Sequence, residues 1–251
     1  MDFRDHRVSD LAARVRSREL SARELTEVAL ERIEALEPRL RAFVVVDAER
    51  AMAAAADVDR RLVEGMGVGP LAGIPLAVKD LEDAEGLATR YGSTLSSDAP
   101  AVGDSVLVAR LRAAGCVVVG KTTTPAYGHK GVTESALSGV TRSPWSLDRT
   151  PGGSSGGSAA ALASGMVPLA TGSDGGGSIR LPSALCGLSG IKTTQGRVPN
   201  GGPTPPGSAH FSVKGPMARR TADLAFALDV CTGPHPTAAA SSPWMGQKTK
   251  G

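Results

Sequence analysis

The sequence predicts an α/β protein, and three observations favour that fold class. Its 251 residues are enough for one large domain or two small ones. Apolar residues make up 41% of them and charged residues 21%, a balance typical of globular proteins. A helical period over 106–114 lies between apolar runs at 74–78 and 116–120. A helix between two buried strands indicates a layered α/β arrangement.

Two helices are expected first, followed by a short strand and a third helix. Ser21 and Glu24 match the S-x-x-E capping box at the start of the second helix. Apolar residues then recur with a helical period, and Pro38 is expected to end that helix. The run Phe-Val-Val-Val at 43–46 predicts the strand, and the alanine-rich segment 48–63 predicts the third helix.

The next part of the chain is expected to place a lysine at the end of a buried strand. The strand is predicted over 74–78, and Lys79 follows its last apolar residue. Such a lysine is commonly a solvated strand end, but burial would lower its pKa and allow it to act as a base. Asp104 is expected to cap the following helix, and 116–120 is the next strand. Residues 121–150 show no period and are predicted to be irregular.

Shorter elements are predicted in the last part of the chain. They are a small-residue helix at 158–164, a strand at 167–170, a short helix at 179–186, a strand at 188–191 and a helix at 222–230. The helix predicted at 158–164 has mostly small side chains and can pack closely against a neighbour, which favours a central position for it. One domain is expected over 1–236, and 237–251 is expected to be a disordered tail.

Composition disfavours several classes of function. The net charge is +3, and two Trp, two Tyr and four Phe offer few surfaces for base stacking, so direct nucleic-acid binding is not expected. No N-terminal signal segment is visible, and no apolar window approaches the roughly 18 residues of a membrane span. Cys116, Cys186 and Cys231 have the spacing of neither a disulfide framework nor a zinc site. We therefore expect a cytoplasmic protein without a metal or cofactor.

Two clusters of glycine and serine, at 152–158 and 172–178, are the most unusual feature of the sequence. Glycine at this density costs backbone entropy, so it is expected where the chain turns sharply or approaches a ligand. Serine hydroxyls beside unobstructed N–H groups can provide a nucleophile and an oxyanion site. A flexible linker is the alternative, but apolar residues run through and beyond both clusters.

Two short motif matches have the wrong context. Gly115 to Thr122 fits the P-loop expression G-x-x-x-x-G-K-[ST], but its middle residues form a predicted strand rather than a phosphate-binding loop. Ser189 and Lys192 fit the S-x-x-K of penicillin-recognising enzymes, whose other motifs do not occur in this chain. Both matches are attributed to chance.

A nucleophile elbow is a further alternative for the first cluster. Two overlapping G-x-S-x-G patterns are centred on Ser154 and Ser155. A triad would need a downstream acid and a histidine. The candidates are Asp174, Asp223 or Asp229 with His210 or His235.

The order of five sequence blocks resembles the amidase signature family, specifically the N-terminal half of an amidase. The resemblance covers about residues 8–236, and the blocks are GIPLAVKD at 73–80, GKT at 120–122, TPGGSSGGSAAA at 150–161, GSDGGGSIR at 172–180 and GLSGIK at 187–192. The resemblance implies a mixed β-sheet flanked by helices, incomplete at its C-terminal side.

Amidase signature enzymes hydrolyse carboxylic amides to an acid and ammonia or an amine through an acyl-enzyme. Carried over by resemblance, Ser178 is the nucleophile, Ser154 the bridging serine and Lys79 the base. Gly175, Gly176 and Gly177 would supply oxyanion-hole N–H groups. The resemblance also implies a cis peptide bond between Gly153 and Ser154. A lysine base must lose the proton that it ordinarily holds at neutral pH.

Three functions remain open at this stage. The first is an amidase acting on a small-molecule amide. The second is the glutaminase subunit of a Glu-tRNA or Asp-tRNA amidotransferase, which shares these blocks. The third is a truncated, inactive amidase-like protein, because the resemblance implies a complete domain roughly twice this long. The missing half would leave apolar surface exposed, which favours self-association or a partner subunit that covers it.

Overall fold

The computed structural model of the protein describes residues 1–200 and 211–236, and a mixed sheet forms its centre. The sheet order is β1 (Phe43–Val46), β3 (Val117–Thr122), β2 (Pro75–Lys79), β6 (Leu169–Asp174), β8 (Val213–Ala218) and β7 (Ser189–Gly190). Strand β2 runs parallel to β3 and β6, whereas β1, β7 and β8 pair antiparallel. The predicted fold class is therefore confirmed. The predicted tail at 237–251 lies outside the described residues.

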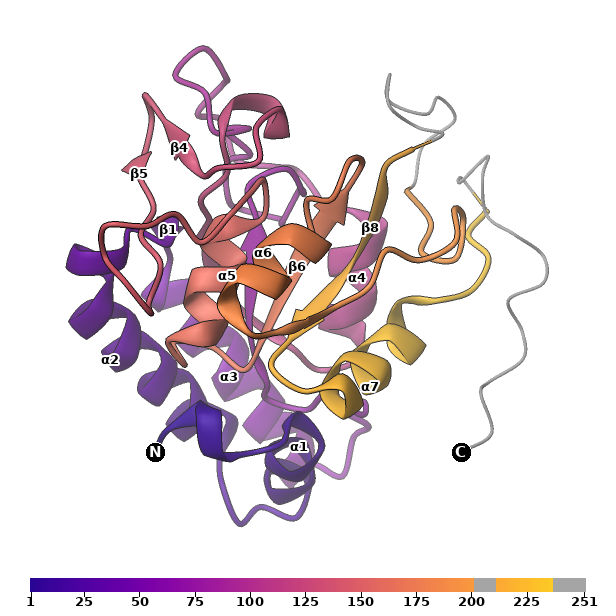
Figure 1. The fold of residues 1–251 in the computed structure, drawn as a ribbon. Helices are drawn as coiled ribbons and strands as arrows, with labels where there is room; N and C mark the ends of the chain where they lie inside the picture. The colour runs from indigo at the N-terminus through magenta and orange to yellow at the C-terminus, as the bar shows by residue number, and fades with distance from the viewer. Residues whose placement is uncertain (201–210, 237–251) are drawn as a thin grey trace.

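Helices flank the sheet. Figure 1 shows α5 (Gly156–Ala163) and α6 (Arg180–Cys186) in front of the central strands and α4 (Val106–Ala113) behind β8. A separate two-stranded sheet, β4 (Glu134–Ser135) with β5 (Gly139–Val140), lies in the segment that was predicted to be irregular. The helices are η1 (Phe3–Asp5), α1 (Val8–Arg16), α2 (Ala22–Leu40), α3 (Ala48–Val63), α4 (Val106–Ala113), η2 (Ala126–Gly128), α5 (Gly156–Ala163), α6 (Arg180–Cys186) and α7 (Thr221–Cys231).

Helix α2 begins as predicted but does not end as predicted. The Glu24 N–H donates to Ser21 Oγ at 3.0 Å and the Ser21 N–H donates to the Glu24 carboxylate at 2.7 Å, which completes the capping box. Pro38 lies inside the helix, which continues to Leu40. The Glu37 carboxylate accepts the N–H groups of the two residues after Arg41, at 2.9 and 3.1 Å. A proline disturbs the turn that precedes it, so the residues after Pro38 can remain helical, and these bonds fix the chain beyond the helix end.

One further sequence prediction was wrong and one strand was missed, each for an identifiable reason. Ser105, not Asp104, is the N-cap residue of α4. The Asp104 carboxylate instead accepts the Glu85 N–H at 2.7 Å and pairs with Arg112 at 2.9 Å. Strand β8 was not predicted, because its sequence VKGPMA contains a glycine and a proline that disfavour strands. Pairing along the whole of β6 forms it nevertheless.

Helix α5 packs against the sheet, and all eight of its residues are buried. Its glycines and alanines leave little side chain between the helix and the strands. A Cβ added at Gly157 would lie 2.4 Å from the Thr123 nitrogen and 2.6 Å from the Ala42 oxygen. The small residues therefore set how closely α5 approaches the end of β3.

We expect Gly157→Ala to destabilise the protein by about 1–3 kcal/mol, the usual cost of overpacking. Alanine is favoured over glycine in a helix by about 1 kcal/mol, which opposes this loss. The sign of the change in unfolding free energy therefore depends on the backbone clash. Urea unfolding measures the change. Gly67→Ala is the control, since a Cβ there meets no atom within 4 Å. Equal stability of the two variants would contradict the close-packing argument.

Candidate active site

The carboxyl ends of three parallel strands converge at one edge of the sheet. Lys79, Thr122 and Asp174 are the last residues of β2, β3 and β6. Lys79 pairs in register with Thr122, and its N–H donates to Thr171 Oγ1 of β6 at 2.9 Å. Ligands of open α/β sheets bind outside the carboxyl ends of the strands, so this edge is the first candidate site.

The Lys79 amine lies among three serine hydroxyls and is fully buried. Its Nζ lies 2.8 Å from Ser154 Oγ, 2.9 Å from Ser155 Oγ and 2.9 Å from Ser173 Oγ. Burial lowers the pKa of Lys79 to about 7, although the charges of Glu82 and Asp174 oppose that shift. A neutral amine has two N–H groups and one lone pair, which is enough for three hydroxyl partners.

The loop before α5 brings Ser154 to this amine. The Gly153–Ser154 peptide bond is cis, as the resemblance implied. A Cβ at Gly153 would lie 2.8 Å from backbone atoms of Val132, so the chain passes close to its neighbour here. The Ser155 N–H donates to the Ser178 carbonyl at 3.2 Å. This bond joins the two glycine and serine clusters directly.

Ser178 and Ser154 share one cavity of about 470 Å³, which Gly175, Gly176 and Gly177 also line. Ser178 is partly exposed and Ser154 is 2% exposed, so the first hydroxyl is open to a ligand while the second lies beneath the surface. Among the described residues no hydrogen bond joins Ser178 Oγ to Ser154 Oγ. The structure thus connects Lys79 directly to Ser154 and places Ser178 in the same cavity.

Asp174 holds the turn that presents Ser178. Its carboxylate accepts the Gly177 N–H at 2.7 Å and the Ile179 N–H at 3.3 Å, and it pairs with Arg180 at 2.9 Å. Burial raises the pKa of Asp174, but these hydrogen bonds outweigh it and hold the pKa below its usual range. The Gly177 N–H is therefore already paired. The N–H groups of Gly175, Gly176 and Ser178 have no acceptor in the part of the chain that the structure describes.

Sequence reasoning did not single out the buried pair that supports this edge. Lys121 Nζ lies 3.4 Å from the Asp80 carboxylate, and both side chains are fully buried. Asp80 also accepts the N–H groups of Arg90 and Gly92, each at 3.0 Å, which fixes the loop after Lys79. The P-loop match drew attention to Lys121, which was expected just after the strand. In the structure it lies within β3, and its amine meets a carboxylate.

The nucleophile-elbow alternative gains no support. The Asp174 carboxylate is engaged with Arg180 and with backbone N–H groups. Lys79 stands beside Ser154, in the place that the elbow would give to a histidine. His210 lies outside the described residues.

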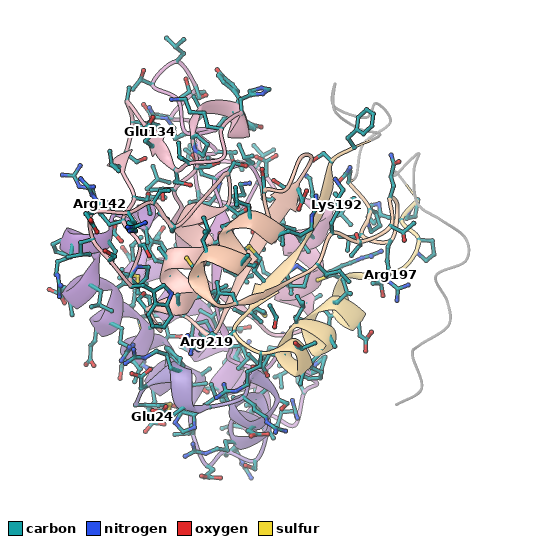
Figure 2. All side chains as sticks on the ribbon, in the orientation of Figure 1. Glu24, Glu134, Arg142, Lys192, Arg197 and Arg219 are labelled. Carbon is teal, nitrogen blue, oxygen red and sulfur yellow. The ribbon has the colours of Figure 1, made fainter. Side chains whose placement is uncertain are left out.

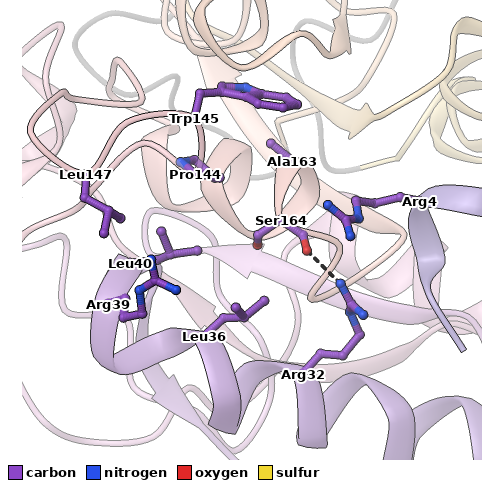
Figure 3. A pocket seen from close by; sticks show the side chains of 10 residues that line it. All are labelled: Arg4, Arg32, Leu36, Arg39, Leu40, Pro144, Trp145, Leu147, Ala163 and Ser164. Atoms are coloured by element: carbon purple, nitrogen blue, oxygen red, sulfur yellow. Dashed lines mark hydrogen bonds between the residues drawn. The ribbon is translucent and has the colours of Figure 1, made fainter.

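A second hollow lies at the other end of α5. Figure 3 shows Arg32, Arg4 and Trp145 around it, and its volume is about 190 Å³. Arg32 donates to the Ser164 carbonyl at 2.9 Å, and Arg32 and Arg4 both pair with Asp2, at 3.2 and 2.7 Å. Arg32 thus pairs with a carbonyl group at the C-terminal end of α5, and both arginines pair with the Asp2 side-chain carboxylate. Their role is structural.

The described residues lack two further kinds of feature. Over 1–200 and 211–236, no group of three His, Cys, Asp or Glu side chains could hold a metal ion. Within the same ranges, no helix has the length and apolar character needed to cross a membrane.

The mixed sheet and the lysine beside two glycine and serine turns define the class of protein as an amidase signature fold. The family model for Amidase matches residues 24–250, and the chain belongs to that family. It is 43% identical over 227 residues to an acylamidase of Rhodococcus erythropolis, covering 90% of this chain and 47% of that protein. It is 46% identical over 218 residues to a glutamyl-tRNA(Gln) amidotransferase subunit of Roseiflexus castenholzii, covering 87% and 44%.

Solved structures agree with the sequence comparisons. A bacterial aryl acylamidase of the amidase signature family superposes with a TM-score of 0.88 at 34% identity, over 94% of this chain and 49% of that one. The chain thus spans about half the length of the relatives that it matches.

Proposed function

We propose that this chain carries the catalytic half of an amidase that hydrolyses carboxylic amides through a Ser–Ser–Lys triad. One observation supports the proposal most strongly. The buried Lys79 amine lies 2.8 Å from Ser154 Oγ, below a cavity that Ser178 also lines. A serine becomes an effective nucleophile only when a base takes its proton, and a lysine with a pKa of about 7 can do so at neutral pH.

In the proposed mechanism, Ser178 Oγ attacks the amide carbonyl carbon. Ser154 takes the Ser178 proton as it passes its own proton to the lone pair of Lys79. The proton returns along the same path to the leaving nitrogen, the carbon–nitrogen bond breaks, and ammonia or an amine leaves. Water then attacks the acyl-enzyme by the same proton route and releases the acid. The Ser154–Ser178 contact that this route needs must form when substrate binds.

The developing oxyanion requires N–H donors aimed into the cavity. Within the described ranges, Gly175, Gly176 and Ser178 offer unpaired N–H groups beside the nucleophile. Gly177 completes the turn with a φ of +126°, which favours glycine, while its N–H binds Asp174. A Cβ at Gly175 or Gly176 would meet no protein atom within 4 Å, so these glycines leave the cavity open to a substrate.

The purified chain should release ammonia or amine from simple aliphatic or aryl amides, and Ser178→Ala should not. Ser189→Ala is the control, because Ser189 shares the residue type but contacts Thr221 instead of the cavity. A fluorophosphonate should label Ser178, as identified by mass spectrometry of peptides. Absence of both hydrolysis and labelling in the wild-type chain would favour an inactive protein.

Activity should rise with pH through about 7. Lys79 acts as a base only when neutral, and its pKa of about 7 is lowered by burial. Below that pH the amine is protonated, so kcat/KM is expected to fall roughly tenfold per pH unit and to level off above it. A pH–rate profile checks this expectation. A profile that falls between pH of about 6 and 8 as the pH increases would contradict Lys79 as the base.

The glutaminase of a tRNA-dependent amidotransferase is a second candidate, because the chain is 46% identical to a glutamyl-tRNA(Gln) amidotransferase subunit. That function would need partner subunits. Exposed apolar side chains offer a contact surface for a partner or a second copy. They are Leu181 and Phe211, which line the cavity, with Leu185 of α6 and Ile191 after β7. Glutamine as the preferred substrate, with co-purification of a tRNA-binding subunit, would favour this candidate over a free-standing amidase.

A further inference from the structure

Lys192, which the proposed mechanism does not use, contacts the turn that holds Gly175 and Gly176. It follows β7 and is labelled in Figure 2. Its Nζ donates to the carbonyls of Asp174 at 2.8 Å, Gly175 at 2.6 Å and Phe211 at 2.6 Å. An ammonium group has three N–H donors, so these three carbonyls use all of them. The Asp174 carboxylate, 3.4 Å away, adds charge attraction.

Two consecutive carbonyls on one ammonium fix the direction of the N–H groups behind them. The C=O and N–H of a planar trans peptide point in opposite directions. The peptides after Asp174 and Gly175 are both trans. Because their oxygens face Lys192, the N–H groups of Gly175 and Gly176 face away from it. Both glycines line the cavity that contains Ser178, and neither N–H has an acceptor among the described residues.

The neighbouring peptides are held by other groups. The Gly177 N–H is bound by Asp174 and the Gly177 carbonyl accepts the Leu181 N–H at 2.7 Å. No other side chain in the described part of the chain donates to the carbonyls of Asp174 or Gly175. Lys192 is thus the support for these two peptide units in particular.

We propose that Lys192 is a positioning residue of the oxyanion hole, and that it orients the N–H groups of Gly175 and Gly176 toward the substrate oxygen. The inference rests on the proposed amidase function. Lys192 is not among the residues that line the cavity with Ser178. Its ammonium holds the backbone so that two donors already point at the place where negative charge develops. The Phe211 contact links the same amine to a residue that lines the cavity.

Lys192→Met tests the inference. The rate of Ser178 phosphonylation by a fluorophosphonate, whose phosphoryl oxygen occupies the oxyanion position, should fall about 100-fold, as for loss of an oxyanion donor. The KM for an amide substrate should change little, because the donors act mainly in the transition state. Arg23→Met removes an exposed cation elsewhere and should leave both values unchanged. An unchanged phosphonylation rate in Lys192→Met, or a change in KM alone, would overturn the inference.

A chemical modification that restores an ammonium group at position 192 should rescue the phosphonylation rate. Lys192→Cys alkylated with 2-bromoethylamine has nearly the length and charge of lysine, and the natural cysteines are buried and protected. Its rate should return to within a few-fold of the wild-type value; failure of rescue in a folded protein would argue against positioning by this amine.

Hydrogen–deuterium exchange of residues 174–178 separates this inference from the proposed function. Exchange there should be faster in Lys192→Met whether or not the chain hydrolyses amides. Unchanged exchange would refute the positioning role, whereas a wild-type chain that is never labelled at Ser178 would refute the amidase proposal.

Discussion

Lys79→Met is expected to lower kcat/KM for amide hydrolysis by at least about 10⁴-fold. A positioned general base commonly contributes about 10²–10⁴, and removing one member of a cooperating triad can cost still more. The variant also removes the polar partner of three hydroxyls within 2.9 Å, including the bridging Ser154. Initial rates of ammonia or amine release, measured at several pH values, check the prediction.

Methionine is a suitable replacement because Lys79 is fully buried. It fills a similar volume without a charge, so the fold should survive and circular dichroism should remain as in wild type. Any residual activity should lose the inflection near pH 7, since the group responsible for it is gone. A folded variant that keeps wild-type activity and the same inflection would show that another group acts as the base.

The position of Lys79 could be predicted from the sequence, but its surroundings could not. An apolar run followed by a lysine indicates the end of a strand, where the amine is more commonly solvated. The structure places Lys79 at that strand end but buries it. Its hydroxyl partners come from residues 75, 76 and 94 positions later in the chain. No local pattern carries contacts of that separation. The family resemblance identified Ser154, whereas nothing in the sequence indicated Ser155 and Ser173 as partners of the amine.

Strand β8 shows the same limit at the level of the fold. Gly215 and Pro216 weaken any local tendency to form a strand. The strand exists because β6 offers a partner along its length, from Asp174 opposite Val213 to Leu169 opposite Ala218. Helix α3 is the opposite case, since its periodic apolar face and Asp47 cap determine its bounds locally. Elements set by their own residues were predictable, and elements set by a distant partner were not.

Lys121→Met should lower the free energy of unfolding by about 3–5 kcal/mol, because it leaves the fully buried Asp80 carboxylate without its counter-charge. Urea unfolding at about pH 7 measures this loss. Lys121 also donates to Thr89 Oγ1 at 2.9 Å, so the loop after Lys79 loses a second contact. Activity should fall with stability, because that loop begins at the proposed base.

The double variant Asp80→Asn/Lys121→Met separates two causes of the stability loss, the unpaired Asp80 charge and the lost packing of Lys121. Asparagine keeps an acceptor for the N–H groups of Arg90 and Gly92 but carries no charge. It should therefore recover much of the stability that Lys121→Met loses. If the double variant is no more stable than Lys121→Met, lost packing rather than an unpaired charge is responsible.

The pH dependence of the single variant provides an independent check on that charge. Burial already raises the pKa of Asp80 in the folded protein, and removing Lys121 takes away an attraction that lowers it. The folded state then binds a proton that the unfolded state releases, so the stability of Lys121→Met should decrease as the pH rises through the folded-state pKa. Its deficit relative to wild type should therefore be smaller at a pH of about 5 than at about 7. A deficit that is constant, or that grows on acidification, would mean that Asp80 is not left as an uncompensated buried charge.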